Sequence, residues 1–293
     1  MTNRESNAIE ISYAASDTRG QRAHWLGNIR KNLQVIRNSA EVGRLAGLLK
    51  GVPGIAVGAG PSLEKNGALL AEVQRNYPLF CSDRALRRVG EYGITPQFVV
   101  VCDAQDRVVD FLKDYDTGGI VLLATTFASP KVLALPWKQR VFFNMLDLDT
   151  KFSEASMNLT QHRVGMIPGT VIVGNACFLL AKLAGCNPVT FVGNDLSMPD
   201  REMALPGERL YEGKDPEGRT VYSVPGYLAG LDWLLRYLRA DVDCVQKRVR
   251  VYNSTEGGIM YSEEIEGMPL REFVEKFPGM EGSVRTKIMQ GLF

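Results

Sequence analysis

The residues that most clearly suggest chemistry form a glycine-rich turn, Gly58-Ala59-Gly60-Pro61-Ser62, between an apolar run and a helical stretch. Gly58 and Gly60 allow a tight turn and let a ligand approach the backbone. Pro61 suits the first turn of a helix, where its missing N–H is not needed, and Ser62 adds a hydroxyl donor. The free N–H groups and the dipole of such a helix favour an anion. The turn therefore predicts a phosphate site and a nucleotide ligand.

Two other interpretations of this turn stay open. A tight strand-to-helix turn needs no ligand at all. A dinucleotide-binding fingerprint requires a third small residue where Leu63 stands, although Asp83 follows the next apolar run, as a ribose-binding carboxylate would. An NAD-dependent oxidoreductase is therefore a further hypothesis, based on Asp83 and an incomplete motif.

Three aspartates follow apolar runs that read as strands: Asp83, Asp103 and Asp195. Ligands of doubly wound sheets bind outside the carboxyl ends of the strands. Carboxylates beside phosphates contact ribose hydroxyls, hold Mg²⁺ or act as general bases. We predict that Asp103 and Asp195 are catalytic, and that they ligate Mg²⁺ if the reaction needs it, while Asp83 contacts the nucleotide. Each of them, taken alone, also fits an aspartate that caps a loop.

Further polar or small residues at turns and helix starts are predicted nucleotide contacts: Arg84, Thr170, Asn175, Gly193, Asn194 and Thr255. A guanidinium fork such as that of Arg84 fits phosphate well, and so does that of Arg219, which lies in a polar loop. Thr170 is placed to cap the helix that follows it. Asn175 lies on an apolar helix and needs a hydrogen-bond partner if buried, for which a nucleobase is one candidate.

Each of these residues also has a purely structural interpretation. An ordinary helix cap explains Thr170, and a solvated loop charge explains Arg219. His162 fits a general base or a surface histidine.

Apolar runs that alternate with helical stretches dominate the middle of the chain. Their continuous hydrophobicity is typical of parallel strands buried on both faces, and the alternation indicates right-handed strand–helix–strand units. The sequence therefore predicts an α/β fold with a Rossmann-like, doubly wound, mostly parallel sheet and helices on both faces. The expected strands are residues 54–58, 79–82, 98–102, 120–125, 141–145, 189–192 and 250–252.

The segments outside these runs complete the expected organisation. Residues 1–50 form an N-terminal arm (1–18) and a basic helix (20–50), whose charge suits a solvated face or an acidic partner. Residues 51–258 form the nucleotide-binding domain, in which the polar stretch 197–223 is long enough to be a functional loop or lid. Residues 259–293 form a C-terminal helical tail.

Composition excludes several classes of protein. The net charge of +1 argues against a nucleic-acid binder that relies on bulk charge. Five cysteines without a CxxC pair argue against a disulfide framework or a structural zinc site. The chain shows no apolar run long enough to span a membrane and no signal-peptide core, so we expect a cytoplasmic protein. Its oligomeric state is left open.

Five motifs in order resemble the MptE-like family, which includes 6-hydroxymethyl-7,8-dihydropterin diphosphokinases and the central domain of Maf flagellar motility accessory factors. They are GAGPSL, GITPQFVVVCD, PGTVIVGNA, LAGCNPVTFVGNDLS and VYNSTEGG, and the resemblance runs from about residue 30 to 260. It implies a Rossmann-like fold and nucleotide-dependent group transfer. The diphosphokinase branch moves pyrophosphate from ATP to a pterin alcohol with Mg²⁺. The Maf branch is implicated in attaching nonulosonic sugars, from nucleotide-activated donors, to flagellin.

Three functional hypotheses follow beside the oxidoreductase. The first is a glycosyltransferase that uses a nucleotide-activated sugar, with a protein or a small molecule as acceptor. The second is a diphosphokinase in which Asp103 and Asp195 hold Mg²⁺ and an arginine stabilises the phosphates. The third is a non-catalytic module that binds a nucleotide as a sensor or assembly factor.

Overall fold

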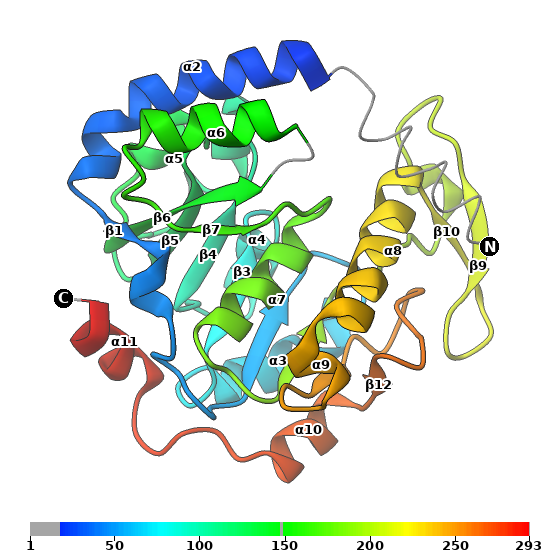
Figure 1. Cartoon of the computed structure of the whole chain (residues 1–293). Coiled ribbons are helices and arrows are strands. Elements are labelled where there is room, and N and C mark those ends of the chain that lie inside the picture. Colours follow the sequence, from blue (N-terminus) through cyan, green and yellow to red (C-terminus); the bar gives the residue numbers. More distant parts are fainter. Residues whose placement is uncertain (1–17, 147–148, 293) are drawn as a thin grey trace.

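A ten-stranded parallel sheet forms the centre of the molecule, in a computed structural model that describes residues 18–146 and 149–292 (Figure 1). The strand order is β1-β6-β5-β4-β3-β2-β8-β11-β12, and β7 also pairs with β6. The strands are β1 (Ala40–Glu41), β2 (Gly54–Val57), β3 (Leu79–Ser82), β4 (Phe98–Val101), β5 (Val121–Thr125), β6 (Gln139–Leu146), β7 (Met166–Pro168), β8 (Val189–Val192), β11 (Val251–Asn253) and β12 (Glu266–Gly267).

The strand order contains a point at which the direction of winding reverses. From β2 the chain adds β3, β4, β5 and β6 on one side, and it then returns to place β8 against the other side of β2. Ligands of doubly wound sheets bind at this switch point, at the carboxyl ends of the strands. The predicted α/β fold and its doubly wound parallel sheet are confirmed.

Helices cover both faces of the sheet. Alternate residues of one strand enter different cores, so that Ala56 packs on one face and Ile55 and Val57 on the other. This two-sided burial explains the continuous apolar runs of the sequence. One face carries α7 (Val173–Leu183), α8 (Pro225–Ala240) and α11 (Val284–Leu292), and the other carries α3 (Leu63–Val73), α4 (Ala85–Glu91), the 3₁₀ helix η2 (Asp106–Phe111), α5 (Pro130–Leu133) and α10 (Leu270–Lys276).

Helix α2 (Thr18–Arg37) lies beside α6 (Thr150–Leu159) and over the loops that follow β4 and β5 (Figure 1). The buried amides of Asn28 and Asn32 donate to four main-chain carbonyls of these loops at 2.9–3.1 Å, and His24 contacts one of them. The spacing of four residues puts all three side chains on one face of the helix. Trp25 stacks on Phe127 at 4.7 Å. Helix α2 therefore covers the carboxyl ends of β4 and β5.

The expected helix over 20–50 is wrong in its second half. Helix α2 ends at Arg37, where Ser39 donates its N–H to the Ile36 carbonyl and its hydroxyl to that of Val35. Strand β1 and the 3₁₀ helix η1 (Val42–Leu45) follow. Periodicity alone could not find this end, because β1 exists only through its pairing with β6, about a hundred residues away.

The polar stretch 197–223 contains regular structure that the sequence analysis did not predict. Strands β9 (Tyr211–Lys214) and β10 (Thr220–Ser223) form an antiparallel hairpin closed by an Asp-Pro-Glu-Gly turn. Those turn residues are a usual hairpin signal. Short helices η3 (Arg201–Met203) and α9 (Val242–Val245) lie before and after it.

Two sequence predictions concern the ends of the chain and the membrane. The N-terminal arm, residues 1–18, falls almost wholly outside the described residues. Within 18–146 and 149–292, none of the helices combines the length and the apolarity that a membrane crossing requires.

The contacts of α2 give a first prediction. Replacing Asn28→Ala leaves the carbonyls of Ala104 and Phe127 without this buried donor, and we expect a loss of about 1–3 kcal/mol in the free energy of unfolding. The exposed Gln34→Ala, on the same helix, should change it by less than about 0.5 kcal/mol. Urea unfolding measures both variants, and equal effects would show that the amide contacts do not hold the helix.

Candidate functional site

Two glycine turns meet at the switch point with no space between them. The N–H of Gly60 donates to the Gly193 carbonyl at 2.7 Å. A Cβ atom on Gly60 would lie 1.8 Å from Oδ2 of Asp195, and one on Gly58 would lie 2.4 Å from the Gly193 oxygen. The glycines of both turns are therefore required by the approach of β2 to β8; for Gly193 the sequence had left open a tight turn against either a ligand or backbone.

The carboxylate of Asp195 lies at the N-terminus of α3. Its Oδ2 accepts the hydroxyl hydrogen of Ser62 at 2.7 Å, and its Oδ1 accepts the Ser62 N–H at 3.2 Å. Burial raises the pKa of Asp195, while the bonds from Ser62 and the charge of Arg88 oppose this rise. A helix N-terminus favours an anion, and here a side chain of the protein supplies it. The regular helix begins at Leu63, after Pro61 rather than at it.

A third turn, after β11, packs against the main chain of Asn194 and Asp195. The hydroxyl of Thr255 accepts the N–H of Asn194 at 3.2 Å. Gly258 has a φ of +70° and passes so close to Asp195 that a Cβ atom would lie 2.0 Å from its carbonyl oxygen. Three of the sequence motifs thus form one packed junction, at the carboxyl ends of β2, β8 and β11.

Several predicted nucleotide contacts have partners within the protein. The buried amide of Asn194 donates to the carbonyls of Ala56 and Val192, and that of Asn175 donates to the Gly230 carbonyl at 2.9 Å, between α7 and α8. Thr170 does not cap α7, because that helix starts at Val173 with Ile172 in the cap position. The assignment of these residues to a nucleotide stays a prediction.

Asp83 and Asp103 lie at the carboxyl ends of the neighbouring strands β3 and β4. Burial raises the pKa of Asp83 to about 6, against the bond from the Arg84 N–H and the Arg84 charge, and the charge of Asp103 adds to the rise. Asp103 is half-buried and accepts the Gln105 N–H at 2.8 Å. The charge of Asp103 therefore acts on the Asp83 carboxyl at this part of the sheet edge.

A pocket of about 500 Å³ opens beside Asp103. Gln105 lines it from the loop after β4 and Arg107 from η2, and Gln21 and Trp25 line it from α2. These four residues carry no local signal in the sequence that marks them as a site, because only the fold brings helix α2 to the end of β4. The lining combines a carboxylate, a guanidinium, two amides and an indole. Such a set suits a polar ligand with an anionic group and a ring.

The predicted arginine and histidine contacts lie in different places. The guanidinium of Arg84 lies 5.0 Å from the Phe111 ring centre. Arg219 pairs with Asp215 at 2.7 Å, within the β9–β10 hairpin. His162 lies on an exposed turn after α6 and contacts the side chain of Asn158 at 3.2 Å. The structure does not bring these three residues together.

Arg88 holds the glycine turn from the side of α4. Its guanidinium donates to the carbonyls of Ala59 and Gly60 at 3.2 Å and to the Glu64 carboxylate at 2.8 Å. Arg88 lies four residues, about one helical turn, after Arg84, which was the arginine predicted from the sequence. The spacing of the two arginines could have indicated Arg88 as a second candidate.

The predicted joint magnesium site of Asp103 and Asp195 is wrong in its geometry. Strands β3 and β2 separate β4 from β8, and three strand spacings amount to about 14 Å, whereas oxygen ligands of Mg²⁺ lie about 2.1 Å from the ion. Among residues 18–146 and 149–292, no group of three or more His, Cys, Asp or Glu side chains is arranged to hold a metal ion.

Comparison with known proteins identifies the family. The profile of the family described as 6-hydroxymethylpterin diphosphokinase MptE-like matches residues 27–201, more than half of the chain. The chain belongs to the MptE-like family. The match includes the turns after β2 and β8, the ends of β3 and β4 and the C-terminal half of α2, from Gly27 on. No curated protein matches the chain closely enough to count as a relative.

One solved structure is similar to this MptE-like chain over most of its length. It is the Maf glycosyltransferase from Magnetospirillum magneticum AMB-1, with a TM-score of 0.62 and 16% sequence identity. The match covers 90% of this chain and 41% of that protein, so the chain spans about two fifths of its length. At this identity the similarity concerns the fold.

The raised pKa of Asp83 predicts how stability depends on pH. With a pKa near 4 when unfolded and about 6 when folded, this carboxyl binds more protons in the folded state between those pH values. Its contribution to stability is therefore present below about pH 4 and is lost as the pH rises through about 6. Relative to the parent chain, Asp83→Asn should gain about 1–3 kcal/mol over this range.

Urea unfolding at pH 4, 5, 6 and 7 measures this difference. The exposed Gln34→Ala, which removes no titratable group, serves as the control, and its difference from the parent should stay flat over the same range. A flat difference for Asp83→Asn as well would mean that the carboxyl is not desolvated in the folded state.

Replacing a glycine by alanine should have opposite effects on stability at Gly60, in the packed junction, and at Gly27, in α2. Gly60→Ala forces the new methyl group into the Asp195 carboxylate, and we expect a loss of about 1–3 kcal/mol or more. Gly27→Ala, in α2, meets no atom within 4 Å and should stabilise the protein by about 0.5–1 kcal/mol. Thermal and urea unfolding distinguish the two signs, and a neutral Gly60→Ala would contradict the close packing of the turns.

Proposed function

We propose that this protein is a nucleotide-dependent group transferase, and that it transfers a sugar from a nucleotide-activated donor to an acceptor hydroxyl. The observation that carries the proposal is the pocket of about 500 Å³ at the carboxyl end of β4, with Asp103 on its wall. Membership of the MptE-like family supports group transfer. The similar solved structure is that of a glycosyltransferase, which supports a sugar as the group.

The side chains around the pocket suit each part of this reaction. The guanidinium of Arg107 pairs with a phosphate of the donor. The amides of Gln21 and Gln105 bind hydroxyls, and the Trp25 indole packs against a sugar or a base. All four line the same pocket as Asp103.

Asp103 is the proposed general base. The acceptor oxygen attacks the anomeric carbon, its proton passes to the Asp103 carboxylate, and the bond from that carbon to the donor phosphate oxygen breaks. The departing nucleotide carries the negative charge, which Arg107 stabilises. Asp83 lies at the next strand end and assists as a hydrogen-bonding group for the acceptor or the ribose.

A second candidate is pyrophosphoryl transfer from ATP to a pterin alcohol, as the family description suggests. The proximity of Asp83 and Asp103 favours it, because Mg²⁺ commonly binds one or two carboxylates together with substrate phosphates. These two side chains would hold the ion, in place of the pair Asp103 and Asp195. Bound Mg²⁺ would neutralise charge on the transferred phosphates.

A ligand screen separates the two candidates. CMP, CDP, UDP, GDP and ATP are added with and without Mg²⁺, and the melting temperature is recorded. A ligand that binds only the folded state raises it. Stabilisation by a nucleoside mono- or diphosphate without Mg²⁺ is the expected result. Stabilisation by ATP only with Mg²⁺ would favour the diphosphokinase, and no shift with any nucleotide would contradict both candidates.

Variants then test the pocket. We expect Asp103→Asn to lower kcat about 10²- to 10⁴-fold with little change in nucleotide affinity, and Arg107→Gln to weaken nucleotide binding. Asp110→Asn is the matched control, because Asp110 lies in η2, which follows Asp103 in the chain, and pairs with Lys113 at the surface. Equal rates for Asp103→Asn and the control would exclude Asp103 as the base.

A further inference from the structure

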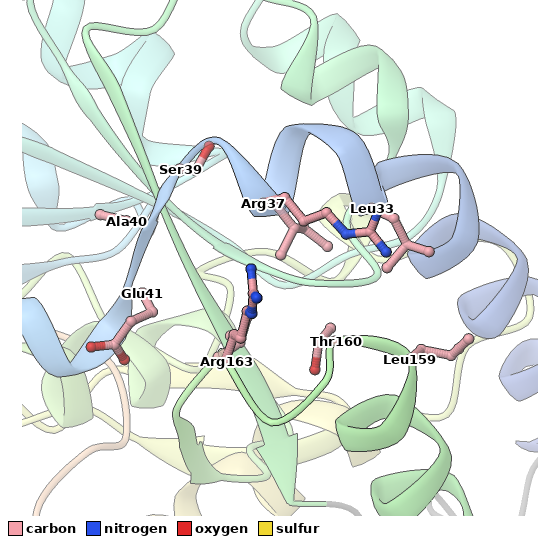
Figure 2. Close-up of a pocket in the computed structure, with 10 residues that line it drawn as sticks. Leu33, Arg37, Ser39, Ala40, Glu41, Leu159, Thr160 and Arg163 are labelled. Atoms are coloured by element: carbon pink, nitrogen blue, oxygen red, sulfur yellow. The ribbon is translucent and has the colours of Figure 1, made fainter.

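A second cavity, of about 220 Å³, lies where the C-terminal end of α2 meets β1 and the turn after α6 (Figure 2). It does not share any lining residue with the pocket beside Asp103. Its walls are partly aliphatic, with Leu33, Ile36 and Leu159 among them, and partly charged. Ligand sites commonly combine apolar walls with a few charged groups in this way.

Two arginines, Arg37 and Arg163, supply positive charge to the cavity. Within residues 18–146 and 149–292, neither guanidinium has a hydrogen-bond or ion-pair partner. The Arg37 side chain does not cap the C-terminus of α2, because the carbonyls of Val35 and Ile36 accept hydrogen bonds from Asn38 and Ser39 instead. Figure 2 shows Arg163 rising from the turn after α6 toward the end of α2 that carries Arg37.

The turn that presents Arg163 adopts an unfavourable backbone conformation. Gln161 and His162 both have a φ of 53°, which is uncommon for residues with a side chain. Main-chain bonds from His162 to Met157 and from Arg163 to Thr160 hold this conformation. Such strain persists where the surrounding contacts hold the backbone in place, and strained residues are frequent where proteins clamp a ligand.

One carboxylate, that of Glu41, also lines the cavity. Its Oε2 accepts the N–H of Gly43 at 2.8 Å, at the start of the 3₁₀ helix η1. Figure 2 shows its carboxylate directed away from the space between Arg163 and α2. The lining therefore contains two guanidinium groups without a partner in the described part of the chain and one carboxylate that is already hydrogen-bonded.

We propose that this cavity binds a small organic anion, in which a phosphate or carboxylate group is joined to an apolar body. The anionic group binds Arg37 and Arg163, since guanidinium groups fit both phosphate and carboxylate. The apolar body packs against Leu33, Ile36 and Leu159. The cavity is smaller than the roughly 300–1,000 Å³ of sites for drug-sized molecules, which limits the ligand to one small ring or a short chain.

Isothermal titration of the full chain tests the proposal with four probes: phenyl phosphate, benzoate, inorganic phosphate and benzyl alcohol. We expect phenyl phosphate or benzoate to bind, with a stoichiometry of one in the variant Arg107→Gln, whose pocket beside Asp103 lacks its guanidinium. The stronger of the two probes identifies the preferred anionic group. Inorganic phosphate lacks the apolar body and benzyl alcohol lacks the charge, so both should bind at least about tenfold more weakly. Absence of saturable binding by both aromatic anions would overturn the proposal.

Variants locate the binding. Arg37→Gln and Arg163→Gln should each weaken the better aromatic anion at least about tenfold, and Arg163→Lys should retain more affinity than Arg163→Gln. Arg107→Gln, in the other pocket, is the matched control and should leave this affinity unchanged. An unchanged dissociation constant in both glutamine variants, or a loss confined to Arg107→Gln, would overturn the proposal.

The two arginines are exposed, so these variants should keep the parent melting temperature. The titrations contain no nucleotide, so their outcome does not depend on the transferase activity proposed above.

Discussion

The buried carboxylate of Asp195 is the contact on which the carboxyl edge of the sheet depends. It accepts both the N–H and the hydroxyl hydrogen of Ser62, and the turn carrying Gly60 passes close against it, while Gly258 passes close against the main chain of Asp195. A desolvated carboxylate is costly unless it is hydrogen-bonded. The N-terminus of α3 supplies both donors and a favourable dipole. Three strand ends are thereby fixed with respect to one another.

This contact divides the carboxyl edge into two parts. At the ends of β2, β8 and β11 the turns fill the space with their own backbone and side chains. At the end of β4, Asp103 lines a pocket under α2, and the buried Asp83 lies at the end of the neighbouring strand β3. The proposed chemistry belongs to the second part, because a substrate needs both open volume and polar groups that are not already paired. The packed part supplies the rigid support that positioned catalytic groups require.

Helix α2 connects the two cavities of the molecule. Trp25 lines the pocket beside Asp103, and Arg37 lines the cavity next to β1. The buried amides of Asn28 and Asn32 fix the helix between them by bonds to the loops after β4 and β5. Twelve residues of α-helix span about 18 Å, so one rigid element carries side chains to two separate sites.

The sequence by itself determined the fold class, since continuous apolar runs that alternate with helical stretches have few other solutions. It also located the turns after β2 and β8 and the aspartates at the strand ends. Only the tertiary structure decided what those residues contact. Asp195 and Asp103 look alike in the sequence, yet one is bonded to Ser62 and the other faces a pocket. Contacts between residues far apart in the chain, such as Trp25 and the end of β4, leave no local pattern, because they arise from packing.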